Sequence, residues 1–139
     1  MNDQNLKDKI TQVMGESKVG TLATVVGNKP HSRYMTFFNE DLILYTPTSK
    51  ETYKAEEIEK NPYVHVLLGY EGEGMGDAYI EVQGRASIRE DQSLKDKFWN
   101  NKMEKRIESP NDPEYIILEI TPETIRLMND HGEPETLNL

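Results

Sequence analysis

The hydrophobic residues of this chain recur with two different periods, and the helical period is clearest near the N-terminus. Apolar side chains there have helical spacing at Leu6, Ile10, Val13 and Met14. This spacing predicts a short amphipathic helix that ends at Gly15. Two further helices are predicted, one near residues 50–60, where Pro62 cannot continue it, and one over about residues 93–107.

Elsewhere the apolar residues are often β-branched and alternate with polar ones, which is typical of strands. The predicted strands cover residues 19–26, 30–38, 42–45, 63–68, 78–89, 115–121 and 124–129. A turn at Gly27-Asn28 joins the first two strands as a hairpin, and the glycine-rich segment 69–77 is predicted to be a mobile loop. Six or seven short strands separated by turns favour a mainly β fold, an antiparallel barrel with flanking helices.

The length and charge of the chain restrict the domain count and the partners. The 139 residues suit one domain, 1–139, in which the polar, aperiodic segment 130–139 is expected to be a loose tail. The formal charge of −9 disfavours nucleic acid and anionic membranes as partners. No apolar run approaches the roughly 20 residues of a membrane span, and no apolar signal core is seen, so a cytoplasmic protein is expected.

Several kinds of catalytic chemistry have no support in the sequence. The absence of cysteine removes disulfides, thiolate nucleophiles and cysteine zinc sites. His31, His65 and His131 do not have metal-binding spacing, so no metal site is predicted. No serine lies in a nucleophile elbow, and no catalytic pair of carboxylates can be singled out. No catalytic residue is assigned, and redox chemistry would have to come from a bound cofactor.

Residues 29–62 concentrate anion-binding groups within an acidic protein. Arg33 shares one strand face with Met35, and a partly buried guanidinium requires an anionic partner, for which its planar fork fits phosphate. Thr52 and Lys54 lie near the start of the second predicted helix, where the helix N-terminus also favours an anion. The alternative is that Arg33 forms an ordinary ion pair, since the chain has 25 carboxylates, and that Lys54 is simply solvated.

A series of short motifs covers nearly the whole chain and resembles one known family. The motifs are residues 20–25, 30–38 with Arg33 and Met35, 44–46, 52–54 with Asn61-Pro62 after them, 82–86 and 112–122. Their order resembles the pyridoxamine 5′-phosphate oxidase-like, FMN-binding split barrel family, and within it the general stress protein 26 group. The resemblance implies a six-stranded antiparallel split β-barrel and a homodimer with a flavin at the subunit interface. FMN is the first choice, with FAD or another flavin as alternatives.

The resemblance also implies a set of cofactor-binding residues and a function. The implied residues are Arg33, Thr52 and Lys54 for the flavin phosphate, and Tyr34, Met35, Thr36, Tyr45 and Thr46 for the ring and ribityl chain. The implied function is a flavin-binding general stress protein that passes electrons from NAD(P)H to a small acceptor. Oxidation of pyridoxamine phosphate is not expected, because Phe38 stands where such oxidases have a basic residue. The alternatives are non-catalytic flavin storage or stress sensing, and a heme-binding or cofactor-free split barrel.

Overall fold

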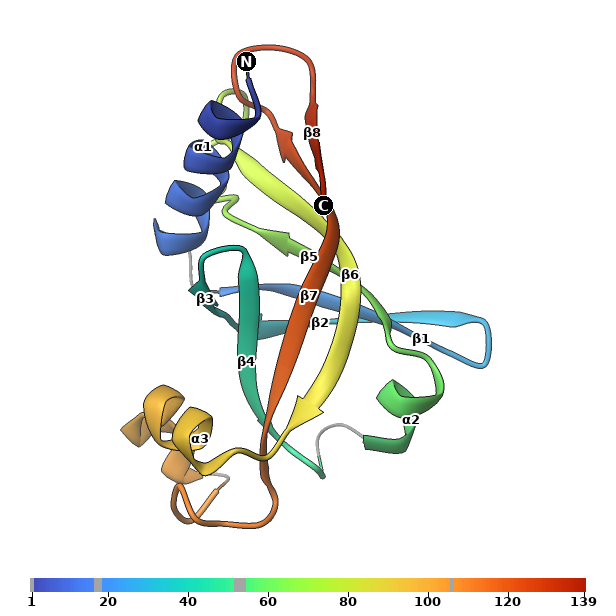
Figure 1. Cartoon of the computed structure of the whole chain (residues 1–139), viewed down its shortest axis with the longest axis vertical. Coiled ribbons are helices and arrows are strands. Elements are labelled where there is room, and N and C mark those ends of the chain that lie inside the picture. The colour runs from blue at the N-terminus through green and yellow to red at the C-terminus, as the bar shows by residue number, and fades with distance from the viewer. Residues whose placement is uncertain (1, 17–18, 52–54, 106) are drawn as a thin grey trace.

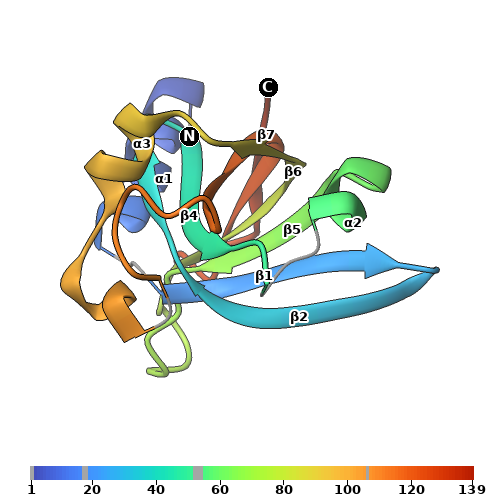
Figure 2. The ribbon, with the colours of Figure 1, turned by 90° about the horizontal axis from the view of Figure 1, so that it is seen from below.

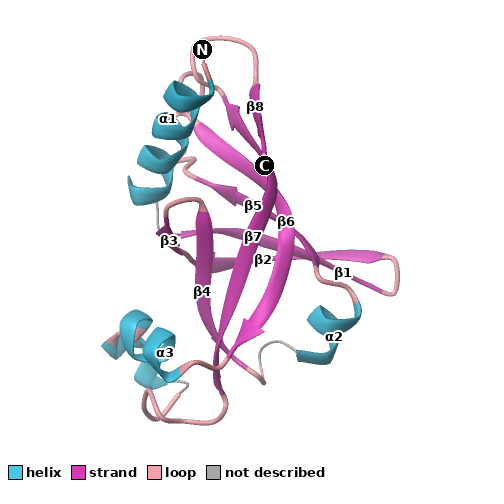
Figure 3. Ribbon diagram, viewed as in Figure 1, coloured by secondary structure: helices cyan, strands magenta, loops and turns pink. Residues whose placement is uncertain are grey.

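The computed structural model describes residues 2–16, 19–51, 55–105 and 107–139 of the chain. In chain order the elements are α1 (Asp3–Glu16), β1 (Val19–Val26), β2 (Lys29–Thr36), β3 (Phe38–Glu40), β4 (Ile43–Ser49), α2 (Ala55–Lys60), β5 (Tyr63–Leu68), β6 (Tyr79–Arg89), α3 (Gln92–Phe98), the 3-10 helix η1 (Asn101–Lys105), β7 (Tyr115–Met128) and β8 (Glu135–Asn138) (Figure 1). Strands dominate, and the helices lie around the sheet (Figure 3). None of the described helices is long and apolar enough to cross a membrane.

The strands form one antiparallel sheet that curls into a half-barrel. Its strand order is β2-β1-β5-β6-β7-β4-β3, and β8 pairs with β7 beside this path. The two ends of the order, β2 and β3, follow one another in the chain, so the sheet curls back toward itself; Figure 2 shows this curl from below. The predicted antiparallel split barrel is confirmed.

The number of strands differs from the six implied by the resemblance, because the described residues contain six long strands and two short ones. The strand expected over residues 30–38 is interrupted at Phe37, so β2 ends before it and the three-residue β3 begins after it. The two segments predicted on either side of Pro122 form the single strand β7. The other short strand, β8, lies in the predicted loose tail. That prediction is wrong for residues 135–138, which pair with β7 and bury Leu137.

Two hydrophobic clusters hold the fold together. The larger lies inside the curled sheet, and α1 covers one end of it with Leu6, Ile10 and Met14, as the helical spacing predicted. The smaller cluster lies under α3 and consists of Tyr45, Phe98, Ile107, Tyr115 and Ile117. Burial of these side chains supplies the main favourable free energy of folding.

The helix predicted over residues 93–107 is broken in two. Trp99 is extended, with φ −66° and ψ 139°, and separates α3 from η1. This conformation lets Phe98 stack on Phe38 and Tyr45, both with ring centroids 5.1 Å away, while Trp99 contacts Tyr115 at 5.6 Å. Aromatic packing thus overrides a continuous helix.

The glycine-rich loop 69–77 has a defined hydrogen-bond framework. The Asp77 carboxylate accepts from the backbone amides of Glu71 and Glu73, each at 2.8 Å. The Asn129 side chain donates to the carbonyl oxygens of Gly74 and Asp77. Hydrogen bonds to the Asp77 carboxylate and from the Asn129 side chain therefore hold this loop, where regular strand pairing is absent.

An irregularity in the longest strand pair depends on a glycine. The β6–β7 register shifts between Gln83 and Gly84, and Gly84 lies opposite Pro122, which has no amide hydrogen to donate. A Cβ atom on Gly84 would lie 2.4 Å from the carbonyl oxygen of Thr121. Only glycine permits this close approach of the two strands.

We expect Gly84→Ala to lower the free energy of unfolding by about 2 kcal/mol, because backbone atoms would have to move to admit the new methyl group. Urea denaturation measures the change. The matched control is Gly15→Ala, whose Cβ meets nothing within 4 Å and which should leave stability unchanged or raise it by up to about 1 kcal/mol. Equal stability of the Gly84→Ala variant and the unmodified protein would contradict the close-approach argument.

Candidate functional site

An open pocket of about 1020 Å³ lies at one end of the curled sheet. One wall comes from the end of β2 and from β3, with residues 33–36 and Phe38. Residues 47–49 of β4 form a second wall, and a third comes from η1 together with Asn100 and Ile107. Its size is at the upper end of the range of about 300–1,000 Å³ typical of small-molecule sites.

Half of the cofactor-binding residues predicted from the sequence line this pocket. They are Arg33, Tyr34, Met35 and Thr36. The β2 strand alternates, so Arg33 and Met35 are partly buried while Tyr34 and Thr36 are exposed. The pocket therefore meets both faces of the end of β2.

The remaining predicted residues lie elsewhere. Tyr45 is in the smaller hydrophobic cluster, stacked on Phe98. Thr46 is fully buried, and its hydroxyl donates to the carbonyl oxygen of Thr36 at 2.8 Å. Neither side chain is among the described residues that line the pocket. Thr52 and Lys54 lie outside the described residues, so their assignment stays a prediction.

The Arg33 guanidinium is held against the neighbouring strand. Its Nη1 atom donates to the hydroxyl of Thr24 at 3.0 Å and to the carbonyl oxygen of Leu22, its register partner on β1, at 3.4 Å. These two bonds fix the position of the guanidinium beside the pocket. A fixed cation at the side of a pocket is suited to binding an anion.

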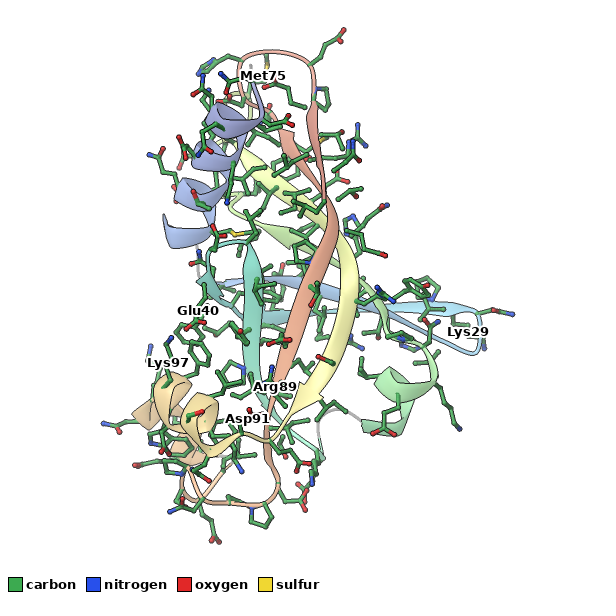
Figure 4. All side chains as sticks on the ribbon, viewed as in Figure 1. Lys29, Glu40, Met75, Arg89, Asp91 and Lys97 are labelled. Carbon is green, nitrogen blue, oxygen red and sulfur yellow. The ribbon has the colours of Figure 1, made fainter. Side chains whose placement is uncertain are left out.

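An ionic network supports the α3 end of the site. Arg89 donates two hydrogen bonds to Asp91, at 2.9 and 2.8 Å, and one to Glu119 at 2.7 Å. The bonds from Arg89 lower the pKa of the Asp91 carboxyl. Burial, followed by the neighbouring Glu119 carboxylate, raises the pKa of Tyr45. Asp91 immediately precedes α3, so this network ties the start of α3 to the sheet; Figure 4 shows Arg89 and Asp91 at this junction.

Further contacts hold α3 against β3 on one side and against Asp112 and the start of β7 on the other. Lys97 forms an ion pair with Glu40 of β3, and the two side chains approach each other in Figure 4. The buried Lys95 donates from Nζ to the carbonyl oxygen of Asp112 at 3.2 Å. The hydroxyl of Tyr115 donates to the Lys95 carbonyl oxygen at 2.8 Å, and burial raises the pKa of Tyr115. The pocket wall that contains η1 therefore follows a helix that is held in place by these contacts.

The sequence did not reveal the pocket wall that follows α3, nor the contribution of residues 47–49 of β4. The lining residues of the wall after α3 include Asn100, Asn101, Lys102, Met103 and Lys105. In a continuous helix the asparagines and lysines among them would have been ordinary solvated residues, and the Asn100-Asn101 pair was a weak sign of a break. Within the described part of the chain, no group of three His, Cys, Asp or Glu residues could hold a metal.

The sequence and structure match known proteins along nearly the whole chain. Residues 6–129 match the family described as pyridoxamine 5′-phosphate oxidase. General stress protein 26 of Bacillus subtilis (strain 168) is 60% identical over 139 residues, which are 100% of this chain and 99% of that protein. The crystal structure of General Stress Protein 26 from Bacillus anthracis str. Sterne is 45% identical, has a TM-score of 0.87, and aligns over 97% of this chain and 99% of that one.

More distant structures share the fold alone. A FAD-binding protein from Mesorhizobium loti is 21% identical with a TM-score of 0.63, over 84% of this chain and 89% of that one. A heme binding protein from Mycobacterium smegmatis is 13% identical with a TM-score of 0.75, over 99% of this chain and 58% of that one. The same sheet is therefore found in proteins named for different cofactors.

Removing the Tyr115 hydroxyl tests the hydrogen bond that joins β7 to α3 next to the pocket wall. We expect Tyr115→Phe to lower the free energy of unfolding by about 1 kcal/mol at pH 8, because the Lys95 carbonyl oxygen loses its donor. The raised pKa of Tyr115 means that the unfolded chain loses this proton first as the pH rises above 10, so its contribution to stability is present below pH 10 and declines above it. Urea midpoints at pH 8 and pH 11 measure both effects.

The difference between the unmodified protein and Tyr115→Phe should therefore be smaller at pH 11 than at pH 8. Tyr70→Phe is the control, because Tyr70 is 56% exposed and its hydroxyl should not affect stability at pH 8. A stability difference that stays constant between the two pH values would show that Tyr115 does not titrate as its burial requires.

Proposed function

This chain belongs to the pyridoxamine 5′-phosphate oxidase family, and we propose that it is a cytoplasmic general stress protein that binds a flavin, FMN or FAD, in the pocket beside Arg33. The observation that carries the proposal is the combination of a fixed cation and apolar surface in one large pocket. Arg33 supplies the cation, while Met35, Phe38 and Met103 supply apolar surface. A flavin has the matching parts, an anionic phosphate and a flat, largely apolar ring.

In this proposal Arg33 binds the flavin phosphate together with Thr52 and Lys54. Tyr34, Met35 and Thr36 contact the ring and ribityl chain. Tyr45 and Thr46 support the pocket without lining it. The Thr46 hydroxyl fixes the backbone of Thr36, and Tyr45 packs under α3. The bound flavin would supply hydride and electron transfer, and the protein would supply binding and orientation.

We also propose that the protein is a homodimer with the flavin at the subunit interface. The support comes from the outer face, defined as the exposed side of β2, β1 and β5. It carries the exposed hydrophobic side chains Val19, Val25, Tyr34, Tyr63 and Leu67. The register places Tyr34 and Leu67 on the same face of the sheet, on either side of Thr21. An exposed apolar patch of this kind is typical of an interaction surface, and Val19 and Tyr34 also line the pocket.

The experiment that tests the proposed function is a flavin titration combined with the absorption spectrum of the purified protein. A flavin spectrum, or saturable binding of added FMN or FAD, is the expected result. A Soret band in place of a flavin spectrum would favour heme, and no binding of either would leave a cofactor-free barrel. Oxidation of NAD(P)H by the flavin-loaded protein would support an oxidoreductase, whereas zero turnover with several acceptors would favour storage or sensing.

We expect Arg33→Ala to weaken flavin binding by about 10- to 100-fold, the effect of losing charge-assisted hydrogen bonds to a phosphate. Fluorescence titration gives the affinity. The control is Arg126→Ala, which removes the same charge from an exposed position on β7 that does not line the pocket. If the two variants bound flavin equally well, Arg33 would not be a phosphate ligand.

We expect Leu67→Glu to convert the dimer to a monomer, because the substitution places a charge among the apolar side chains of the outer face. Light scattering after gel filtration should report twice 16.0 kDa for the unmodified protein and 16.0 kDa for the variant. Met75→Glu is the control, since Met75 is 98% exposed and lies in the loop 69–77, at the top of Figure 4, rather than on the strands of the outer face. A Leu67→Glu variant that remained dimeric would place the interface elsewhere.

A further inference from the structure

The charges that line the pocket differ from those of the rest of the protein. The chain has 25 acidic and 16 basic residues. Among the described residues that line the pocket, three are charged, namely Arg33, Lys102 and Lys105, and all three are positive. The pocket is therefore a local cationic site on an acidic protein, and such a site attracts anions.

The two lysines belong to a different wall from Arg33. They lie on η1, whereas Arg33 lies on β2. Both lysine side chains are exposed, and within the part of the chain that the structure describes neither forms an ion pair, in contrast to Lys97 with Glu40. Their ammonium groups are thus free to bind a ligand in the pocket.

The backbone that carries these lysines is held in place. The amide of Lys102 donates to the Asn100 side chain at 3.0 Å, and the amide of Ile107 donates to the carbonyl oxygen of Met103 at 2.9 Å. Met103 and Ile107 also pack in the smaller hydrophobic cluster under α3. The lysines therefore extend from a fixed turn, which limits the conformational entropy lost when they bind an anion.

Arg33 and the lysines need not bind the same anionic group. The flavin phosphate is assigned to Arg33 on β2, whereas Lys102 and Lys105 lie on η1, a different wall of the pocket. We propose that Lys102 and Lys105 bind the anionic group, a phosphate or a carboxylate, of a second small molecule that lies beside the flavin. This inference rests on the proposed function and names the class of molecule that shares the site.

The test measures the affinity of the flavin-loaded protein for two probes, NADPH and inorganic phosphate, by calorimetry. We expect Lys102→Ala combined with Lys105→Ala to weaken binding of at least one probe about tenfold or more, while the affinity for FMN changes less than about twofold. Lys102→Arg combined with Lys105→Arg should retain binding, because it keeps both charges. Loss of NADPH binding would identify a dinucleotide as the ligand, and loss of phosphate binding alone would identify a smaller anion.

The matched control is Lys29→Ala combined with Lys60→Ala. These lysines are exposed, do not line the pocket, and Lys29 lies at the far tip of the β1–β2 hairpin (Figure 4). Equal weakening by the control would attribute the effect to overall charge and would overturn the proposal. Unchanged affinity for both probes in the Lys102 and Lys105 variant would also overturn it. A parallel loss of FMN binding would assign the lysines to the flavin itself.

Failure of the proposed function gives a different result. If the unmodified protein bound no flavin, the same titrations on the flavin-free protein would still measure whether Lys102 and Lys105 bind an anion. Lysine-dependent binding there would support the anion site without the flavin. Lack of binding of either probe to the unmodified protein would overturn the inference.

Discussion

The arrangement of this protein depends on how the chain turns at Phe37. There the sheet changes from β2 to β3, with Phe37 buried at 1% exposure in the core and the Thr46 hydroxyl donating to the Thr36 carbonyl oxygen at 2.8 Å. The turn allows β2 and β3 to form the two ends of one curled sheet. It also places residues 33–36 beside residues 47–49, and the space that remains between them is part of the pocket.

The pocket and the outer face share residues, so two proposed properties of the protein are physically connected. Val19 and Tyr34 are exposed on the outer face and also line the pocket. A second subunit packed on that face would reduce the exposure of the pocket to water. Lower exposure strengthens electrostatic contacts with a bound phosphate, so dimerisation and flavin binding would favour one another.

The sequence predicted the elements whose signal is local. The bounds of β1 and β5 were predicted correctly, because alternation with one buried face has a period of two and is bounded by clear turns. It did not predict the break at Trp99, which depends on aromatic partners from β3 and β4, nor β8, whose four residues are too few for periodicity. For the site, the anion-binding motif at Arg33 was visible in the sequence, but the wall at Lys102 and Lys105 required the three-dimensional structure. Tyr45 and Thr46 had matching motifs, yet packing turned their side chains into the interior.

The β1–β2 hairpin extends away from the body of the protein, as Figure 2 shows, and β2 is the last strand at its end of the sheet. Gly27 and Asn28 form its tip with φ values of 57° and 63°. Backbone groups along an edge strand can recruit a strand from another chain and so begin aggregation. Here Pro30 removes one amide donor from that edge, and the exposed Lys29 adds a charge that repels an identical edge. Residues of the β1–β2 hairpin therefore also protect its free edge from pairing with the same edge of another molecule.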